Sequence, residues 1–98
     1  MNRTEHLLTC LIEECAEVQK AASKALRFGL DDHAPDGSIT KNEESIAYEC
    51  IDLLAIIEML REENIIPLLN AQQLIVDKKN KVKKYMEYAK ERGTLYGD

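Results

Sequence analysis

Five acidic residues fall in two short stretches of the chain, with a spacing suited to binding a metal ion. They are Glu13, Glu14 and Glu17 in the stretch LIEECAEV, and Glu49 and Asp52 in the stretch ECID. Both stretches lie within apolar patterns that recur every three to four residues, which is typical of helices. Because residues three apart on a helix are neighbours on its surface, each stretch presents an E-x-x-E or E-x-x-D pair of carboxylates together.

A helical wheel places the acids of the first stretch on or beside an apolar face. With Leu7 at zero and about 100° for each residue, Glu14 falls at about 340°, close to Ala25 at about 0°. Glu17 falls at about 280°, on the border of that face, and Glu13 falls further out, at about 240°. We therefore expect Glu14 to be buried, Glu17 to lie at the edge and Glu13 to face solvent.

The second stretch repeats this arrangement. With Ile46 at zero, Leu60 and its apolar neighbours span the arc from about 280° to about 340°, and Glu49 falls within it at about 300°. Asp52 falls at the edge of that arc, at about 240°. Two consecutive helices are thus expected to carry a pair of acids on or beside their apolar sides.

Such acids need a partner if they are to stay ionised. An unpaired buried carboxylate costs several kcal/mol, and converging carboxylates repel one another. A divalent cation removes both difficulties, and ligands that are all oxygen favour Mg²⁺, or Mn²⁺, over zinc. A di-iron centre is disfavoured because neither His6 nor His33 forms the required E-x-x-H pair. The alternative is that the acids only solvate the faces of a non-catalytic helical oligomerisation module.

The composition narrows the fold class. The chain has 98 residues, of which 45% are hydrophobic, 32% charged and 5% aromatic. This length predicts a single helical domain, 1–98, and the scarcity of Gly, Pro and aromatics favours an all-α fold. The three cysteines lack the spacing of a zinc or redox motif, so we expect them to be reduced, small core residues.

Charge and hydropathy exclude several partners. The net charge of −5 disfavours nucleic acid as a partner, although one short basic cluster lies at 78–84. No apolar run is long enough to cross a bilayer, so no membrane association is expected. The first residues lack the layout of a signal peptide, which predicts a cytoplasmic location.

Three long helices account for most of the chain. The first is expected at 4–28 with Thr4 as its N-cap, and the second follows a capping box at Thr40 and Glu43 and runs to about residue 63. The third is expected from about residue 67 or 68 to 91, with a kink or a separate first turn near residue 70, and it ends at Gly93. The segment 30–40 between the first two helices reads as a loop.

The apolar positions exceed what one small monomer can bury. The expected core positions are Leu7, Leu11, Val18, Ala22 and Leu26 in the first helix, and Ile46, Cys50, Leu53, Ile57 and Leu60 in the second. Pairing of helices between subunits is the simplest way to cover such faces. We therefore expect a bundle of long antiparallel helices completed by homo-oligomerisation, as a homodimer or a dimer of dimers.

The two acidic stretches resemble the signature of a known family. EECAE at 13–17 followed by ECID at 49–52 resembles the E-E-x-x-E … E-x-x-D signature of the MazG-type all-α nucleotide pyrophosphohydrolases. That superfamily also includes dimeric dUTPases, dCTP pyrophosphatases and phosphoribosyl-ATP pyrophosphatases. The stretch ECAEVQKAASKALRFGL is similar to small MazG-like proteins of bacteria and phages. The gap between the two motifs is long for the family, and its extra length falls in the 30–40 loop.

The resemblance implies Mg²⁺-dependent hydrolysis of nucleoside triphosphates between the α- and β-phosphates. The products would be a monophosphate and pyrophosphate, in a role of nucleotide-pool housekeeping. The matching metal ligands are Glu14, Glu17, Glu49 and Asp52. Glu13 matches the first acid of the motif, and its implied role is catalytic, as an acid behind the ligands or as a group orienting the attacking water. Phosphoribosyl-ATP hydrolysis is an alternative within the same chemistry.

Cationic and polar residues for a triphosphate are found on the first and third helices. Lys24 and Arg27 follow the first acidic motif. The candidates in the third helix are Lys78, Asn80 and Lys81, which resemble residues that hold phosphate or sugar in related enzymes, and Tyr85, which could stack on a base. The alternative for each is an ordinary solvated position, or a cation that complements a helix dipole.

Overall fold

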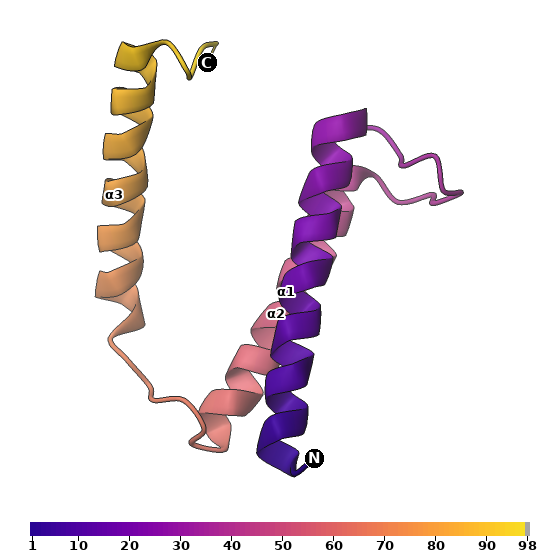
Figure 1. Ribbon diagram of the computed structural model, residues 1–98, viewed down its shortest axis with the longest axis vertical. Helices are drawn as coiled ribbons and strands as arrows, with labels where there is room; N and C mark the ends of the chain where they lie inside the picture. The colour runs from indigo at the N-terminus through magenta and orange to yellow at the C-terminus, as the bar shows by residue number, and fades with distance from the viewer. Residues whose placement is uncertain (98) are drawn as a thin grey trace. The chain divides into compact units, whose positions relative to one another are not determined.

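The computed structural model describes residues 1–97 and contains three helices. They are α1 (Arg3–Phe28), α2 (Asn42–Glu62) and α3 (Ala71–Arg92) (Figure 1). Within residues 1–97 there is no strand, and only an isolated bridge joins His33 to Lys41. The prediction of an all-α protein is confirmed. The chain divides into two compact units, Met1–Pro67 with α1 and α2, and a second that begins at Leu68 and contains α3.

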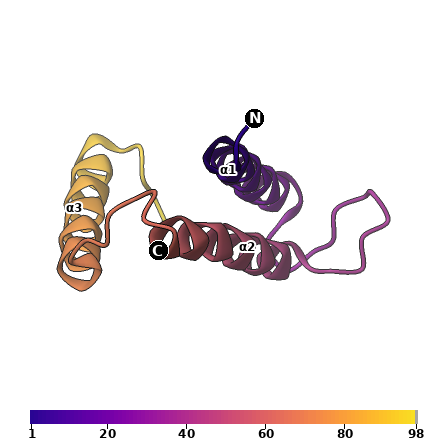
Figure 2. The same cartoon turned by 90° about the horizontal axis from the view of Figure 1, so that it is seen from below.

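Within the first unit, α1 and α2 form an antiparallel pair. Arg3 at the start of α1 binds Glu63 just after α2, with 2.6 Å between Nε and Oε1 and 2.8 Å between Nη2 and Oε2. At the other end the helices are joined by the loop 29–41, which projects beyond them (Figures 1 and 2). The ion pair joins the helices at one end and the loop joins them at the other.

The starts of α1 and α2 differ by one or two residues from the prediction. Asn2, not Thr4, is the N-cap of α1, and its Oδ1 accepts a hydrogen bond of 2.8 Å from the backbone N–H of Glu5. The second helix is capped at Lys41, whose N–H donates to the carboxylate of Glu44 at 3.2 Å. The predicted capping box therefore lies one residue too early, because Lys41 is still extended and forms the bridge to the loop.

The prediction for the start of α3 was also early. This helix begins at Ala71, without a separate turn or a kink near residue 70. Asn70 has a non-helical conformation, and its carbonyl accepts the first helical hydrogen bond, from the N–H of Leu74 at 3.2 Å. The end of α3 agrees with the prediction, because Gly93 has a φ of 77°, which favours glycine.

The core of the first unit is small and only partly matches the predicted stripe. Leu7 and Leu60 are buried as expected, but α1 otherwise buries Ala21 and Ala25 rather than Ala22 and Leu26. Leu26 is 89% exposed. The reason is that α1 packs against one helix in this unit, and one helix covers an arc narrower than the whole apolar face.

The cysteines are free, but two of them are not core residues. Cys15 and Cys50 are exposed, and Cys10 is half-buried. The prediction that Cys50 lies in the core of the second helix is therefore wrong. The cause is the same as for Leu26, since these positions lie on flanks that the α1–α2 contact does not reach.

Among the described residues, no helix is both long enough and apolar enough to span a bilayer.

Candidate metal site and adjoining pocket

Three carboxylates from the two helices converge at the middle of the first unit. Glu14 on α1 and Glu49 and Asp52 on α2 each offer an oxygen, and these oxygens all lie within 4.8 Å of one another. Glu14 and Glu49 are half-buried and Asp52 is exposed. The helical wheels gave the right order of exposure, but Glu14, which was expected to be buried, is only half-buried. The antiparallel pairing brings Glu14 opposite the E-x-x-D turn, so residues far apart in the sequence share one site.

The donor set fits a hard divalent cation. All three groups are carboxylates, and Mg²⁺ prefers oxygen ligands in an octahedral arrangement while keeping several waters. Three protein ligands on one side would leave the remaining positions to water or to the oxygens of a substrate phosphate. The exposed position of Asp52 places one edge of the cluster in reach of such a ligand.

The surroundings of Glu14 disfavour its charged form in the absence of a cation. Partial burial raises the pKa of this carboxyl above its usual range, and the charges of Asp52 and Glu49 raise it further. Glu13 and Glu17 add smaller contributions of the same sign. A cation bound between these groups would reverse the repulsion and lower the pKa.

This raised pKa predicts how stability depends on pH when no metal is bound. Because Glu14 binds its proton more tightly in the folded state, the protein gains stability as the pH falls through the range just above the usual pKa of Glu. As the pH rises through the raised pKa, that contribution is lost. In the presence of a chelator, the advantage in melting temperature of Glu14→Gln over the wild type should shrink as the pH falls.

The measurement is a set of thermal melts of both proteins over a range of pH. Comparing the variant with the wild type cancels the acidic groups with lowered pKa values, Asp36 and Glu63, which act in the opposite direction. A difference in melting temperature that stays constant at every pH would contradict the raised pKa of Glu14.

Of the five acids predicted from the sequence, two lie outside the three-oxygen cluster. Glu17 is half-buried and lines an adjoining pocket, while its charge still acts on Glu14. Glu13 is exposed and also influences Glu14. The structure therefore brings together three of the four predicted ligands, and the assignment of Glu17 as a ligand stays a prediction.

The adjoining pocket has a volume of about 110 Å³ and carries charges of both signs. It lies between the C-terminal half of α1, the N-terminal half of α2 and the loop that joins them. Its lining residues are Glu17, Lys20, Ala21 and Lys24 from α1, Ala34 and Ser38 from the loop, and Asn42, Ser45 and Glu49 from α2. Glu49 belongs to both the pocket and the carboxylate cluster, so a molecule in the pocket would lie next to a bound cation.

Asn42 holds the loop against this pocket. Only 2% of this residue is exposed, and its Nδ2 donates a hydrogen bond of 2.8 Å to the carbonyl of Gly29. Its backbone N–H donates to the carbonyl of Asp32 at 2.9 Å, and the N–H of Glu43 donates to Leu30 at 2.8 Å. The first residues of the loop are thereby fixed to the first turn of α2.

Sequence reasoning did not select Lys20, Asn42 or Ser45. A signal for two of them was present, because Lys20 lies three residues after Glu17 and Ser45 lies four before Glu49, which puts each on the face of an acid. Asn42 carried no comparable signal, since its partner is a backbone carbonyl across the loop. The wheel finds neighbours on one helix but not contacts between elements.

The predicted cations of α1 have different surroundings. Lys24 is half-buried at the pocket, and its Nζ lies 2.6 Å from Oδ2 of Asp36. Arg27 is exposed, and its guanidinium stacks over the ring of Phe28 at 4.8 Å. Arg27 is not among the residues lining the pocket, so of the two only Lys24 is brought to the site.

The candidates on α3 belong to the second unit. All four are exposed: Lys78, Asn80, Lys81 and Tyr85. The Nζ of Lys81 lies 5.9 Å from the centre of the Tyr85 ring, within the range of a cation–π contact. Roles of these residues in holding phosphate, sugar or base stay predictions.

Comparisons of the chain with known protein families, with curated proteins and with solved structures found no match.

Proposed function

We propose that this protein hydrolyses nucleoside triphosphates, ribo- or deoxyribo-, to a monophosphate and pyrophosphate in a reaction that depends on Mg²⁺ or, in its place, Mn²⁺. The observation that carries the proposal is the convergence of Glu14, Glu49 and Asp52 from two helices within 4.8 Å. The charged pocket beside them adds a place for phosphate groups. The likeness of the two acidic stretches to the MazG-type signature supplies the reaction class.

Glu14, Glu49 and Asp52 would hold the metal, with Glu17 as a fourth candidate ligand from the pocket wall. The cation supplies charge neutralisation at the phosphate oxygens and lowers the pKa of bound water. Lys20 and Lys24 would attract the phosphates into the pocket, and the exposed Glu13 would orient the attacking water. The water oxygen would form a bond to phosphorus and release a proton to solvent. The bond between that phosphorus and the α–β bridging oxygen would break, the bridging oxygen would leave with the other product, and no covalent enzyme intermediate is required.

We further propose that the active form is a homodimer or a dimer of dimers. Large apolar side chains remain exposed in the first unit, including Ile12 at 71%, Ile51 at 62% and Leu54 at 51%. In the second unit, α3 contains no buried residue among those described. Such surfaces favour association between copies, because exposed apolar area is removed from water on pairing.

The same exposed surfaces favour the second candidate, a non-catalytic helical oligomerisation module. In that case the acids would be solvating groups, and neither metal nor nucleotide would bind. Phosphoribosyl-ATP hydrolysis is a further alternative, which the same acidic cluster would serve. Nucleotide-pool housekeeping in the cytoplasm is the cellular role that we propose for the triphosphate hydrolase.

Analysis of reaction products tests the proposal and separates these candidates. The protein is incubated with Mg²⁺ and a panel of canonical and modified NTPs and dNTPs, together with phosphoribosyl-ATP, in water enriched in ¹⁸O. We expect monophosphate and pyrophosphate, with the label in whichever product contains the attacked phosphorus. The same reactions with Glu49→Ala should give no products.

Each other outcome would point elsewhere. Diphosphate with orthophosphate would contradict cleavage between the α- and β-phosphates. Turnover of phosphoribosyl-ATP alone would move the assignment to that alternative. No turnover, together with no stabilisation by millimolar Mg²⁺ or Mn²⁺, would favour the oligomerisation module.

A further inference from the structure

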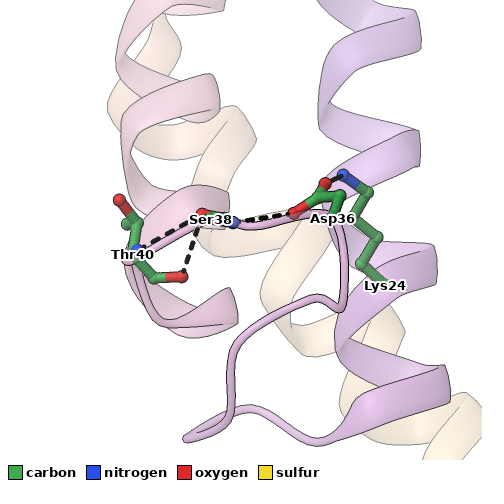
Figure 3. A network of polar contacts seen from close by, with 4 residues as sticks. All are labelled: Lys24, Asp36, Ser38 and Thr40. Carbon is green, nitrogen blue, oxygen red and sulfur yellow. Dashed lines mark hydrogen bonds and ion pairs between the residues drawn. The ribbon is translucent and has the colours of Figure 1, made fainter.

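The loop beside the pocket carries a carboxylate that pairs with Lys24, a lysine that lines the pocket. Oδ2 of Asp36 lies 2.6 Å from Nζ of Lys24, and its Oδ1 accepts a hydrogen bond of 3.1 Å from the N–H of Ser38 (Figure 3). Ser38 Oγ in turn accepts from the N–H of Thr40 at 3.2 Å. A lysine ammonium and a backbone N–H are groups that also bind phosphate oxygens.

This contact joins the middle of the loop to α1, while its ends are held separately. Asn42 and the backbone of α2 fix the residues at the start of the loop, as described above. The side chain of Asp36 is the ionic link between the loop and Lys24. The link can therefore open while the ends of the loop remain in place.

The ion pair is accessible to a competing anion. The side chain of Lys24 is 30% exposed and that of Asp36 is 48% exposed, and partly exposed pairs of this kind are weak. Lys24 and Ser38 both line the pocket that adjoins the acidic cluster. An anion that enters the pocket would meet the lysine that Asp36 holds.

We propose that the carboxylate of Asp36 competes with substrate phosphate for Lys24. Asp36 pairs with Lys24 in the free protein, and the phosphate chain of a nucleotide displaces Asp36. The proposal deepens the function proposed above and rests on it. A triphosphate with its metal offers several charged oxygens to Lys24 and Lys20, whereas Asp36 offers one carboxylate. The loop then acts as a strap, which is closed on Lys24 in the free protein and released when phosphate binds.

The ionisation of Asp36 agrees with this role. Its hydrogen bond with Lys24 and the one from the Ser38 N–H lower the pKa of Asp36 below its usual range. The carboxylate is therefore charged at neutral pH and competes throughout the physiological range. Glu17 and Glu49 also line the pocket and repel a bare phosphate, so the competition is expected with Mg²⁺ present.

Calorimetric titration with inorganic triphosphate in excess Mg²⁺ tests the proposal without relying on catalysis. Asp36→Asn keeps the shape of the side chain and removes the charge, which should tighten binding by about threefold to fivefold, as expected for release of a weak ion pair. Asp31→Asn is the matched control, because it removes the same charge from an exposed position in the same loop. This control should change affinity less than about twofold.

A double variant identifies the route of the effect. In a Lys24→Met background, Asp36→Asn should no longer tighten binding, because the competed group is gone. Equal affinities of Asp36→Asn and Asp31→Asn would overturn the proposal, and so would a gain that persists without Lys24. Absence of triphosphate binding by every folded variant, as checked by thermal melts, would overturn it as well.

The binding test of Asp36 and the hydrolysis test of the proposed function can fail independently of each other. If the protein hydrolyses nucleotides but Asp36→Asn does not change the affinity for triphosphate, the proposed role of Asp36 is wrong and the enzyme assignment stands. If Asp36→Asn binds triphosphate more tightly but no variant hydrolyses nucleotides, Asp36 competes with anions at a binding site and the enzyme assignment is wrong.

Discussion

Replacing Glu49 with glutamine is expected to reduce metal-dependent hydrolysis strongly and to remove metal-induced stabilisation, while leaving the fold intact. Glu49 is the residue that belongs both to the three-oxygen cluster and to the pocket. An amide of the same shape keeps the volume but removes the charge that would attract a cation. We expect a loss in kcat/KM on the order of a hundredfold or more, which is typical for removal of a single group that stabilises charge in the transition state.

The metal-free protein should respond in the opposite direction. The charge of Glu49 contributes to raising the pKa of Glu14, so its removal relieves repulsion between half-buried acids. The melting temperature of Glu49→Gln in a chelator should therefore equal or exceed that of the wild type. This opposite sign separates loss of a metal ligand from simple damage to the fold.

Glu58→Gln supplies the matched control. Glu58 lies on the same helix, is exposed and is not part of the cluster. Because each variant loses one carboxylate, Glu58→Gln has the same net charge as Glu49→Gln. Melting temperatures are measured with and without millimolar Mg²⁺, alongside kcat/KM for all three proteins. Equal stabilisation of Glu49→Gln and the wild type by Mg²⁺ would contradict the role of this acid as a ligand.

The sequence predicted the acidic cluster well because the relevant information is local. Spacing on one helix shows which acids share a face, and the wheels correctly ranked Glu14 as more buried than Glu13 and Glu49 as more buried than Asp52. Helix order and a connecting loop then suggest that the two faces meet. The convergence of Glu14 with Glu49 and Asp52 follows from these facts together with antiparallel packing.

The sequence predicted less where the answer depends on contacts between elements. The burial of Ala21 rather than Leu26 depends on which part of the apolar face of α1 lies against α2, which no periodicity encodes. The pairing of Lys24 with Asp36 depends on the path of a loop whose length alone was visible. Lys24, which was predicted to bind substrate, is thus paired with an acid from the loop.

The core of the first unit is small enough that a single truncation should have a large effect. Leu60 is fully buried, with 0% exposure, and its carbonyl accepts hydrogen bonds from the N–H groups of Ile65 and Ile66 at 2.9 and 3.3 Å. Leu60→Ala should lower the free energy of unfolding by about 3 kcal/mol, from lost burial and the cavity left behind. For a domain of this size that is a large part of the total.

Leu26→Ala is the matched control for this second prediction. Leu26 lies on α1 of the same unit but is 89% exposed, so the same truncation should cost less than about 1 kcal/mol. Urea unfolding of the wild type and both variants at one fixed protein concentration measures the difference. Equal losses for the two variants would show that burial of the Leu60 side chain does not dominate the stability of this unit.

The Leu60 variant also connects the core to the site. Glu14 and Glu49 come from different helices, so a cation that bridges them binds only when α1 and α2 are paired. Saturating Mg²⁺ should therefore recover part of the stability lost in Leu60→Ala, by an amount that grows with the ratio of metal concentration to Kd. The recovery should be absent when Glu49→Gln is added to the same variant. Recovery that persists in the double variant would mean that Mg²⁺ acts elsewhere on the protein, and the bridging role of the cluster would fail.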